Sequence, residues 1–489
     1  MKKKNWLIVG ILAVVTFLLG MLANSIMGRK AETEMISTSP TANFQQFESR
    51  NEMWGKYYPR QYDAWEQTAD TTFRSKYMSS DNDDLLALRP EMVILWAGYA
   101  FSKEYTAPRG HMHTIEDVTN TLRTGSPTDS THSPQPGTCW TCKSPDVPRL
   151  MEKVGLENYY KAPFDKWGSE IVNPLGCANC HDHKTMNLTI TQPALVEAFN
   201  RQGKDISKAT HQEMRTLVCA QCHVEYYFKG ENKYLTFPWD KGTTVDDIEK
   251  YYDESGWTDY VHSVSRTPIL KAQHPDYEIW KMGIHGQRGV SCADCHMPYN
   301  TQGGVKVTDH HISSPLRNVS ASCQTCHRQS EDELKKNVFE RQEVIFGLRI
   351  KLEKELAKVH FKAKHLWDNG ATEEQMKPIL SLIRRAQWRW DFAHSSHGSV
   401  FHAPMESQRI LSDGMIYAME AENALDVLKE KLHITAPFVM PDISTKEKAQ
   451  KEIGLDIPKE EKAKKEFLKN IVPKWIKEAK EKGLLVTQR

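Results

Sequence analysis

The chain has 489 residues, enough for a large buried core and for more than one domain, and its 64 Lys and Arg residues balance 63 Asp and Glu to leave a formal net charge of +1. Because the charges are balanced so evenly, the chain has no overall electrostatic field that would attract nucleic acid or an anionic membrane. We therefore expect no nucleic-acid partner. Hydrophobic residues make up only 39% of the chain, which is low for this length, so apolar cofactors inside the fold would supply part of the missing core.

The N-terminus carries an export signal. Three lysines at positions 2–4 precede an uncharged, mostly apolar run from Trp6 to Met27. This run is longer than the ~7–15-residue apolar core of a cleaved signal peptide and close to the ~20 residues that cross a bilayer. Residues 23–25 offer only a weak cleavage site. We interpret residues 1–28 as a signal sequence or membrane anchor, favouring the uncleaved anchor, and residues 29–45 as a polar tether.

Cysteine spacing is the most specific feature of the chain. All ten cysteines fall into five Cys-x-x-Cys pairs, four of them followed by histidine and the first by lysine. Cys-x-x-Cys-His attaches a c-type haem, because the two thiols form thioethers to the porphyrin and the imidazole takes one axial position on the iron. The five sites are Cys139/Cys142/Lys143, Cys177/Cys180/His181, Cys219/Cys222/His223, Cys292/Cys295/His296 and Cys323/Cys326/His327.

Other roles for these cysteines explain less of the pattern. A structural zinc site takes two pairs, and five pairs cannot be divided in that way. Thioredoxin-like redox motifs do not come in fives with a histidine after each. Disulfides suit an exported chain, but they do not explain the same histidine offset four times. We therefore predict five covalently bound haem c groups.

Lys143 sets the first haem apart. An amine binds iron only after losing its proton, and burial beside a metal charge lowers the lysine pKa in the required direction. One odd ligand among five indicates one haem for chemistry and four for electron transfer. Electron-transfer haems usually hold a second protein ligand, and sixteen of the twenty histidines remain as candidates once the four proximal ones are set aside. Spacing alone does not choose among them.

The second half of the chain has a different character. The region of the five cysteine pairs is rich in Pro, Gly and Ser and shows little continuous helix or strand period, whereas the sequence after His327 is helical and strongly charged. The predicted helices cover residues 331–366, 372–394, 405–432 and 458–482. We expect a mainly α fold with a loop-rich pentahaem core at 46–330, followed by long C-terminal helices in 331–489 that pack on the core or on a second subunit. A solvated helical layer is the alternative.

Several motifs resemble those of one known family. They resemble the pentahaem cytochrome c nitrite reductases that form ammonia, and the likeness runs from about residue 45 to the C-terminus. The resemblance implies a multihaem cytochrome c fold that reduces nitrite by six electrons at the lysine-ligated haem, fed by four bis-histidine haems. The matching segments are 139–143, 219–228, 271–274, 386–390, 402–404 and 441–449.

The resemblance also implies a substrate pocket beside Lys143, formed by Arg123, Tyr226 and His274. Nitrite is an anion, so an arginine and a protonatable histidine would attract it and polarise its oxygens. Its reduction to ammonium consumes eight protons and releases two waters, which requires proton donors near the iron. Taken singly, each of these residues is far more often structural, and only the motif context singles them out.

A calcium ion is the second cofactor that the resemblance implies. Its ligands would be the Glu225 carboxylate, the backbone carbonyls of Tyr226 and Lys271, and the side-chain oxygen of Gln273. All are hard oxygen donors, as calcium requires, and the alternative is ordinary loop packing.

The distal haem ligands follow from the resemblance in the same way. His310 would serve the second haem along the chain, His111 the third, His402 the fourth and His285 the fifth. His311 adjoins His310 and is an alternative to it. Three near matches, which we expect at the surface or behind the ligands, are His113, His394 and His397.

The family further implies a periplasmic homodimer joined through its long C-terminal helices and docked on a redox partner. An uncleaved anchor favours a membrane-bound quinol-oxidising multihaem cytochrome as electron donor over a soluble periplasmic cytochrome.

Two other functions stay open. One is a pure electron carrier, which would need no lysine ligand and would offer a fifth distal histidine. The other is a reductase acting mainly on hydroxylamine, nitric oxide or sulfite.

Overall fold

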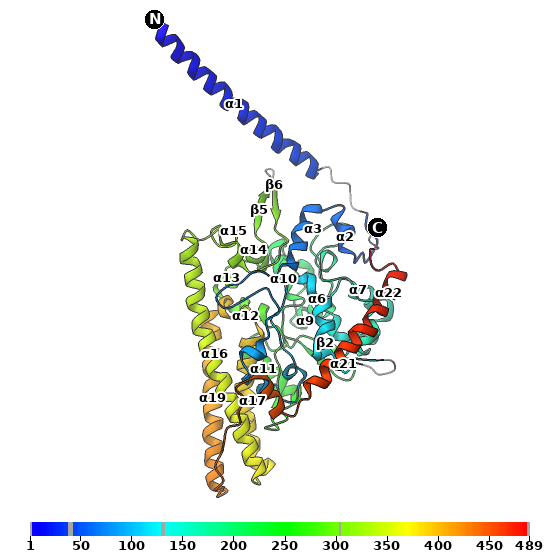
Figure 1. Cartoon of the computed structure of the whole chain (residues 1–489), viewed down its shortest axis with the longest axis vertical. Coiled ribbons are helices and arrows are strands. Elements are labelled where there is room, and N and C mark those ends of the chain that lie inside the picture. The colour runs from blue at the N-terminus through cyan, green and yellow to red at the C-terminus, as the bar shows by residue number, and fades with distance from the viewer. Residues whose placement is uncertain (1, 38–42, 129–132, 303–304, 487–489) are drawn as a thin grey trace.

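The computed structural model describes residues 2–37, 43–128, 133–302 and 305–486. Figure 1 shows a loop-rich core, one long helix that projects from it, and a group of long helices along one side. The strands of the described part form short two-stranded hairpins and no larger sheet. The predicted mainly α fold, with a loop-rich core followed by long C-terminal helices, is confirmed.

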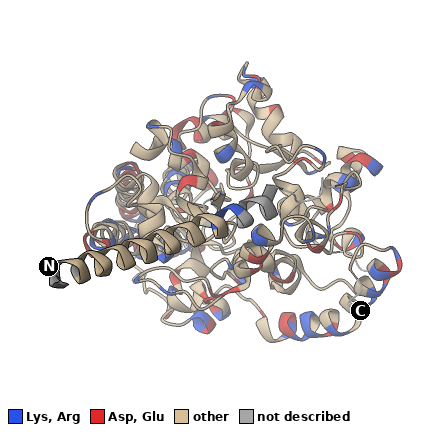
Figure 2. Ribbon diagram, turned by 90° about the horizontal axis from the view of Figure 1, so that it is seen from above, with Lys and Arg blue, Asp and Glu red and all other residues tan. Residues whose placement is uncertain are grey.

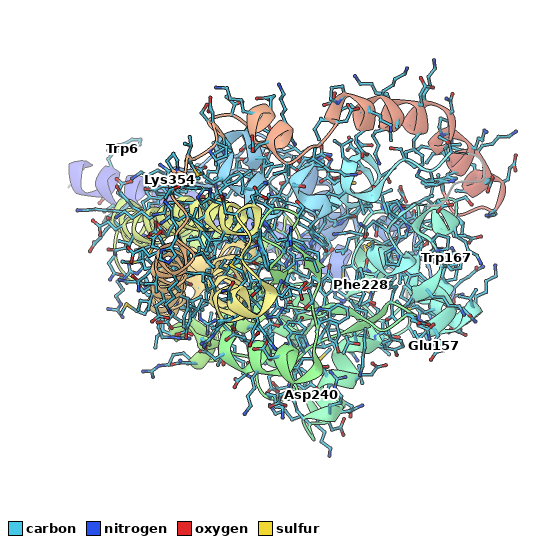
Figure 3. The ribbon with its side chains drawn as sticks, turned by 90° about the horizontal axis from the view of Figure 1, so that it is seen from below. Trp6, Glu157, Trp167, Phe228, Asp240 and Lys354 are labelled. Atoms are coloured by element: carbon cyan, nitrogen blue, oxygen red, sulfur yellow. The ribbon has the colours of Figure 1, made fainter. Side chains whose placement is uncertain are left out.

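α1 (Lys2–Ser37) is a continuous helix that stands away from the core (Figure 1). Within it, Ile8–Lys30 is long and apolar enough to cross a membrane, and none of this stretch is buried by the rest of the chain. Figure 2 shows α1 almost free of charge, whereas both signs are interspersed over the core. Trp6 stands clear of the core (Figure 3). α1 includes the first part of the predicted tether, and residues 38–42 of that tether lie outside the described part.

The first half of the core consists of short helices joined by loops. α3 and α7 begin with proline in their first turn, where the missing N–H costs nothing, and the 3-10 helices are written η. These elements are α2 (Asn51–Gly55), α3 (Pro59–Glu66), η1 (Gln67–Ala69), α4 (Leu85–Leu88), α5 (Glu91–Leu95), η2 (Ala100–Ser102), η3 (His111–His113), α6 (Thr114–Asn120), η4 (Leu122–Thr124), η5 (Gly137–Trp140), α7 (Val147–Val154), α8 (Leu156–Lys161) and η6 (Phe164–Trp167).

The second half of the core continues this pattern. α10, α11 and α14 each begin with a capping box, in which a Thr or Ser hydroxyl and an acidic side chain three residues later bond each other's backbone N–H groups. The helices are η7 (Cys177–Asn179), α9 (Pro193–Arg201), η8 (Ile206–Lys208), α10 (His211–Ala220), α11 (Val245–Ser255), α12 (Asp276–Met282), α13 (Ile284–Gln287), α14 (Cys292–His296), η9 (Pro315–Arg317) and α15 (Val319–Ser322).

Three antiparallel hairpins interrupt these helices. The strand pairs are β1 (Tyr227–Lys229) with β2 (Tyr234–Thr236), β3 (Tyr260–Val261) with β4 (Pro268–Ile269), and β5 (Tyr299–Gln302) with β6 (Val305–Thr308). In the first pair Tyr227 lies opposite Thr236, and in the third Tyr299 lies opposite Thr308. Two of the hairpins adjoin predicted site residues, since β1 follows Tyr226 and β6 precedes His310.

Long helices follow the core, as the sequence predicted. α16, α17 and α19 pack against one another along one side of the molecule (Figure 1), and Ser330 caps α16 through a bond from the Glu333 N–H to its hydroxyl at 3.2 Å. A second apolar cluster between these helices includes Val359, Met376 and Leu425. The elements are α16 (Glu331–Asp368), α17 (Glu373–Ser395), α18 (Ser399–His402) and α19 (Pro404–Lys431).

The last helices return to the core. We call residues 446–484 the C-terminal strap, which contains α20 (Lys446–Glu452), α21 (Ile457–Asn470) and α22 (Val472–Glu481). The prediction of one helix over 458–482 is wrong: Pro473 has no N–H to continue α21, and a new helix starts at Val472. Figure 1 shows α21 and α22 on the opposite side of the core from α16 and α19.

Buried ion pairs tie the long helices to the core. Arg389 of α17 is nearly inaccessible and donates to both oxygens of Glu249 on α11, at 2.9 and 3.0 Å, and to Asp246 at 2.7 Å. Two parallel bonds from one guanidinium to one carboxylate form the strongest arrangement of such a pair. Glu249 is itself 6% exposed, so losing Arg389 would leave a buried carboxylate with only the longer contact to Arg385 at 3.6 Å.

We predict that replacing Arg389 by methionine lowers the free energy of unfolding by about 3–5 kcal/mol, because the buried Glu249 loses both of its short bonds and keeps only the longer contact with the partly exposed Arg385. Calorimetry on the haem-loaded protein measures this as a fall in the thermal midpoint. Arg385→Met is the control, because the Arg385 side chain is 39% exposed and lies 3.6 Å from Glu249; its effect should stay below about 1 kcal/mol. Equal losses in the two variants would contradict the prediction.

Candidate active site

Each cysteine pair lies in one tight turn of backbone. The N–H of the second cysteine bonds the carbonyl of the first at 3.1 Å in the pairs that begin at Cys177, Cys219 and Cys323. In these three turns the N–H of the following histidine also reaches that carbonyl, at 2.9–3.0 Å. Residues three and four apart on a helical turn lie on one side of it, which is the arrangement that two thioethers and an axial imidazole require. All ten cysteines lie in described parts of the chain, and no disulfide joins any two of them.

Cys326 departs from the other nine cysteines in its burial. Cys326 is exposed, whereas the other nine are half-buried. The reason is its position: the last cysteine pair lies at the edge of the core, where the exposed stretch 324–330 leads into α16. Its turn keeps the geometry of the other pairs, with the Cys326 N–H on the Cys323 carbonyl at 3.1 Å. Cys326 therefore stays a predicted haem attachment point, but at the surface of the chain.

Three predicted ligand pairs face each other across the core. The ring centroids of His181 and His310 are 6.2 Å apart, and those of His296 and His402 are 6.1 Å apart. His285 and His327 are also 6.1 Å apart. A histidine nitrogen binds a transition metal at about 2.0–2.1 Å and lies about 1 Å from its ring centre, so two imidazoles on one metal have centroids ~6 Å apart. The residues therefore fit three bis-histidine haems.

Backbone carbonyls fix several of these imidazoles. Nδ1 of His181 contacts the Met186 carbonyl at 2.8 Å, Nδ1 of His296 contacts that of Ser313 at 2.9 Å, and Nδ1 of His310 contacts that of Thr308 at 2.9 Å. A proton held on Nδ1 leaves Nε2 free to bind a metal, which is the usual arrangement of ligating histidines. Sequence reasoning missed these carbonyls, since any residue type can supply one.

The fourth predicted pair is His111 with His223. The pKa of His111 is lowered to about 3, mainly by burial and to a smaller extent by the nearby His223 and Lys143. Its Nδ1 is buried without a hydrogen-bond partner in the described part of the chain. The pair therefore lies together close to Lys143, although the structure brings it less directly face to face than the other three.

The near-match histidines have other environments. His113 contacts Glu116 at 3.2 Å and the Ala69 carbonyl at 3.1 Å, and the His311 N–H bonds Asp309 at 2.9 Å. His394 is fully buried and stacks on Trp390, with ring centroids 5.0 Å apart. Of the two options that we gave for His394, the surface is excluded.

The four predicted pocket residues converge from separate elements. Arg123 lies in η4, Lys143 follows η5, Tyr226 precedes β1, and His274 lies between β4 and α12. The rings of Tyr226 and His274 have centroids 6.5 Å apart. The positive charges of Lys143 and Arg123 both act on the Cys139 thiol, and that of Lys143 acts on His274. The structure therefore brings all four residues to the first cysteine pair.

Arg123 is held in place by its neighbours. Its guanidinium lies over the Phe101 ring, 4.5 Å from the centroid, and its Nε donates to the Thr121 hydroxyl at 3.1 Å. The side-chain amide of Gln135 donates to the Arg123 carbonyl at 3.3 Å. Stacking and hydrogen bonding together fix a cation that can bind a small anion through its terminal nitrogens.

Burial controls the protonation of the other two pocket residues. It raises the pKa of Tyr226 well above the ordinary value, so the phenol keeps its proton. Burial also lowers the pKa of His274 well below the ordinary value. An anion beside His274 would act in the opposite direction and favour its protonated form.

The predicted calcium ligands lie together. Glu225 is completely buried and accepts a bond from the Gln273 N–H at 2.6 Å, and the Gln273 amide nitrogen lies 3.2 Å from the Lys271 carbonyl. A half-turn of that amide would present its oxygen instead, an orientation that hydrogen bonding decides. No cluster of three or more His, Cys, Asp or Glu side chains suits a metal in the described ranges, and the predicted set contains only one carboxylate. These oxygen donors fit a calcium ion.

One supporting interaction was missed by sequence reasoning. The Lys271 ammonium is buried and donates to Asp391 at 2.9 Å, to the Ser395 hydroxyl at 3.0 Å and to the Ala272 carbonyl. The bond to Asp391 thus anchors the loop of the predicted calcium ligands to α17. Asp391 and Ser395 lie 120 residues and more away in sequence, where no local motif connects them.

A glycine lets two ligand loops meet. A Cβ on Gly283 would come within 1.8 Å of the His402 carbonyl oxygen, so only glycine permits the loop before His285 to approach His402 this closely.

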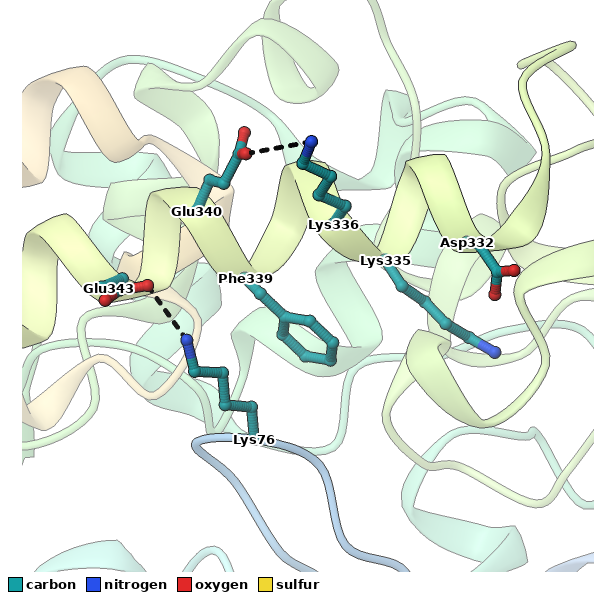
Figure 4. Close-up of a pocket in the computed structure, with 7 residues that line it drawn as sticks. All are labelled: Lys76, Asp332, Lys335, Lys336, Phe339, Glu340 and Glu343. Atoms are coloured by element: carbon teal, nitrogen blue, oxygen red, sulfur yellow. Dashed lines mark hydrogen bonds and ion pairs between the residues drawn. The ribbon is translucent and has the colours of Figure 1, made fainter.

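A surface hollow between the loop of Lys76 and α16 is lined by charged side chains such as Lys335 and Glu343 and by none of the predicted site residues (Figure 4).

Comparison with known proteins agrees with this site. The family model described as cytochrome c552 matches residues 50–483. The cytochrome c-552 of Parabacteroides distasonis is 59% identical over 482 residues, covering 99% of this chain and 98% of its own length. That of Maridesulfovibrio salexigens is 45% identical over 496 residues, covering 99% and 97%. The solved catalytic subunit of the cytochrome c nitrite reductase from Desulfovibrio desulfuricans, described with two calcium sites, matches with a TM-score of 0.76 and 28% identity over 85% of this chain and 91% of that one.

We predict that His310→Ala converts one low-spin haem to high spin, because the ring facing His181 would be lost. His311→Ala is the matched control and should leave the haem spectrum unchanged, since the N–H of His311 bonds Asp309. Electron paramagnetic resonance of the two oxidised variants measures the difference. A low-spin loss in His311→Ala alone would reverse the assignment.

Proposed function

The chain belongs to the cytochrome c552 family, and from this membership we propose that it is an exported oxidoreductase that reduces nitrite to ammonium at the haem bound by Cys139 and Cys142. The observation that carries the proposal is the convergence of Arg123, Tyr226 and His274 on the one cysteine pair followed by lysine. Cys139, Cys142 and Lys143 would hold the haem that supplies the redox chemistry.

Lys143 is the proposed proximal ligand of that haem. An amine donates its lone pair to a metal, and lysine is the residue at the histidine position of this one pair. The other cysteine pairs carry histidine at the same position. The proposed bis-histidine pairs are His181 with His310, His223 with His111, His296 with His402, and His327 with His285.

Arg123 is proposed to bind nitrite. Its guanidinium is fixed over Phe101 before substrate arrives, so little ordering is required on binding. A fixed cation in a water-poor pocket interacts with an anion more strongly than it would in solvent. Because this interaction exists before and during reaction, we expect it to contribute mainly to substrate affinity.

Tyr226 and His274 are proposed to handle protons. Eight protons enter for each nitrite reduced to ammonium and two waters, which balances the six electrons and the change of charge from −1 to +1. The phenol of Tyr226 stays protonated and can donate a hydrogen bond. His274 is neutral without substrate, and an anion beside it would draw a proton onto its ring, ready for transfer to an oxygen.

A calcium ion is proposed at Glu225, Tyr226, Lys271 and Gln273. The ion would compensate the buried Glu225 carboxylate, whose burial otherwise raises its pKa well above the ordinary value. Two of its ligands adjoin pocket residues, since Glu225 precedes Tyr226 and Gln273 precedes His274. Calcium would thus fix both pocket side chains through the backbone.

The long helices are proposed to form a homodimer. α16 and α19 expose apolar side chains, among them Val344, Ile350, Ile416 and Met419, and a second copy would cover this face. The domain division that we propose places the catalytic core at 46–330 and the dimer-forming helices after it. Analytical ultracentrifugation of the double variant Ile416→Glu/Met419→Glu tests this interface. If the variant still sediments as a dimer with unchanged affinity, the interface lies elsewhere.

α1 is proposed to remain as a membrane anchor, with a membrane-bound quinol-oxidising multihaem cytochrome as electron donor. The support is the apolar stretch Ile8–Lys30, which is long enough to span a bilayer. A mature protein that begins near Ile26 after purification from membranes would rule the anchor out and favour a soluble donor.

We predict that the purified haem-loaded protein, supplied with reduced viologen, consumes six electrons per nitrite and releases ammonium. Lys143→Met should reduce this turnover by at least about 100-fold, because a thioether or open position changes the ligand field of the reacting iron. Product analysis with labelled nitrite and viologen oxidation measure both quantities.

Lys153→Met is the matched control, because Lys153 is an exposed lysine ten residues away on α7. It should keep full turnover and full haem content. Rapid reduction and reoxidation of all haems without nitrite consumption would instead assign the protein as an electron carrier.

A further inference from the structure

The C-terminal strap inserts one buried lysine beside the turn of Arg123. Lys464 of α21 is only 4% exposed, and its ammonium donates to the Thr119 carbonyl at 3.0 Å, to the Thr124 hydroxyl at 3.3 Å and to the Gly125 carbonyl. These acceptors lie on both sides of Arg123 in sequence. One side chain from the far end of the chain therefore closes the turn that carries the proposed nitrite ligand.

A second residue of the strap binds the loop that supports the Arg123 guanidinium. Gln450 of α20 is 3% exposed, and its amide donates to the carbonyls of Ser102 at 3.0 Å and Lys103 at 2.9 Å. Ser102 follows Phe101, the ring on which the Arg123 guanidinium lies. The strap thus contacts both the turn that carries the guanidinium and the loop that supports it.

Acidic groups face Lys464 from both sides. Glu104, from the core, accepts a bond from the Leu122 N–H at 2.6 Å, and Glu460, from α21, pairs with Lys103 at 2.8 Å. Burial lowers the pKa of Lys464 to about 8, and these two carboxylates oppose that effect. Burying an amine is costly unless its donors are used, and here they are used on three oxygens of a single turn.

We propose that Lys464 is a positioning residue for the nitrite site, holding the turn of residues 119–125 so that Arg123 stays aligned with the pocket. The inference rests on the proposed role of Arg123. If Lys464 served only to attach the strap, its loss would lower stability without changing how the protein binds nitrite. Positioning instead alters substrate affinity and the local dynamics of the turn.

The test compares Lys464→Met with Lys465→Met, an exposed neighbour on the same helix. We expect Lys464→Met to raise the KM for nitrite, and the Kd from optical titration of the oxidised protein, by roughly tenfold while kcat changes by less than about twofold, because an anion contact made before and during reaction affects binding uniformly. Hydrogen exchange of the peptide that covers residues 119–125 should also speed up, since the N–H groups of Thr124 and Gly125 bond carbonyls within the turn and that of Leu122 bonds Glu104. Lys465→Met should change none of these.

Unchanged nitrite affinity and unchanged exchange in Lys464→Met would overturn the proposal, even if the thermal midpoint fell. Should Lys464→Met fail to accumulate, Lys464→Gln, which keeps a shorter donor, provides the same comparison with a smaller expected effect. If the wild-type protein does not reduce nitrite, the proposed function fails, yet hydrogen exchange still decides whether Lys464 holds the turn.

Discussion

The spacing between facing imidazoles is the constraint on which the core depends. Centroids 6.1–6.2 Å apart leave room for one metal ion between two rings and little else. Short helices and loops suffice to hold such pairs, because one ring of each pair follows a cysteine turn, and carbonyl contacts such as that of His181 with Met186 orient several of the rings. A core of this kind needs cofactor contacts in place of a continuous sheet or helical bundle, which accounts for the loop-rich chain and its modest hydrophobic content.

The reactive end of this core is held by long-range polar contacts. Lys271 bonds Asp391 of α17, and Lys464 of α21 bonds the turn of Arg123. Both lysines are nearly inaccessible, and each satisfies several acceptors in a region where unpaired oxygens would be costly. The C-terminal helices therefore have two tasks: α16 and α19 expose the face proposed for dimerisation, and the strap supports the pocket.

Much of this arrangement could be predicted from the sequence, and the remainder shows where local patterns stop being informative. Cysteine spacing indicated five haem sites but not that Cys326 would be exposed, because spacing carries no information on where a turn lies in the fold. The family motif selected His310 over His311, whose environments differ in the structure. Helical period placed α16, α17 and α19, but it continued one helix across Pro473. The contacts of Lys464 carry no sequence signature, because they join distant segments through backbone oxygens.

The central claim is that one haem is open to substrate while four are closed by histidine pairs. Electron paramagnetic resonance of the oxidised protein, recorded before and after nitrite is added, tests this most directly. We expect four low-spin haems that nitrite leaves unchanged and one haem whose signal shifts on binding. Five low-spin haems with no response to nitrite would contradict it and would identify the chain as an electron carrier.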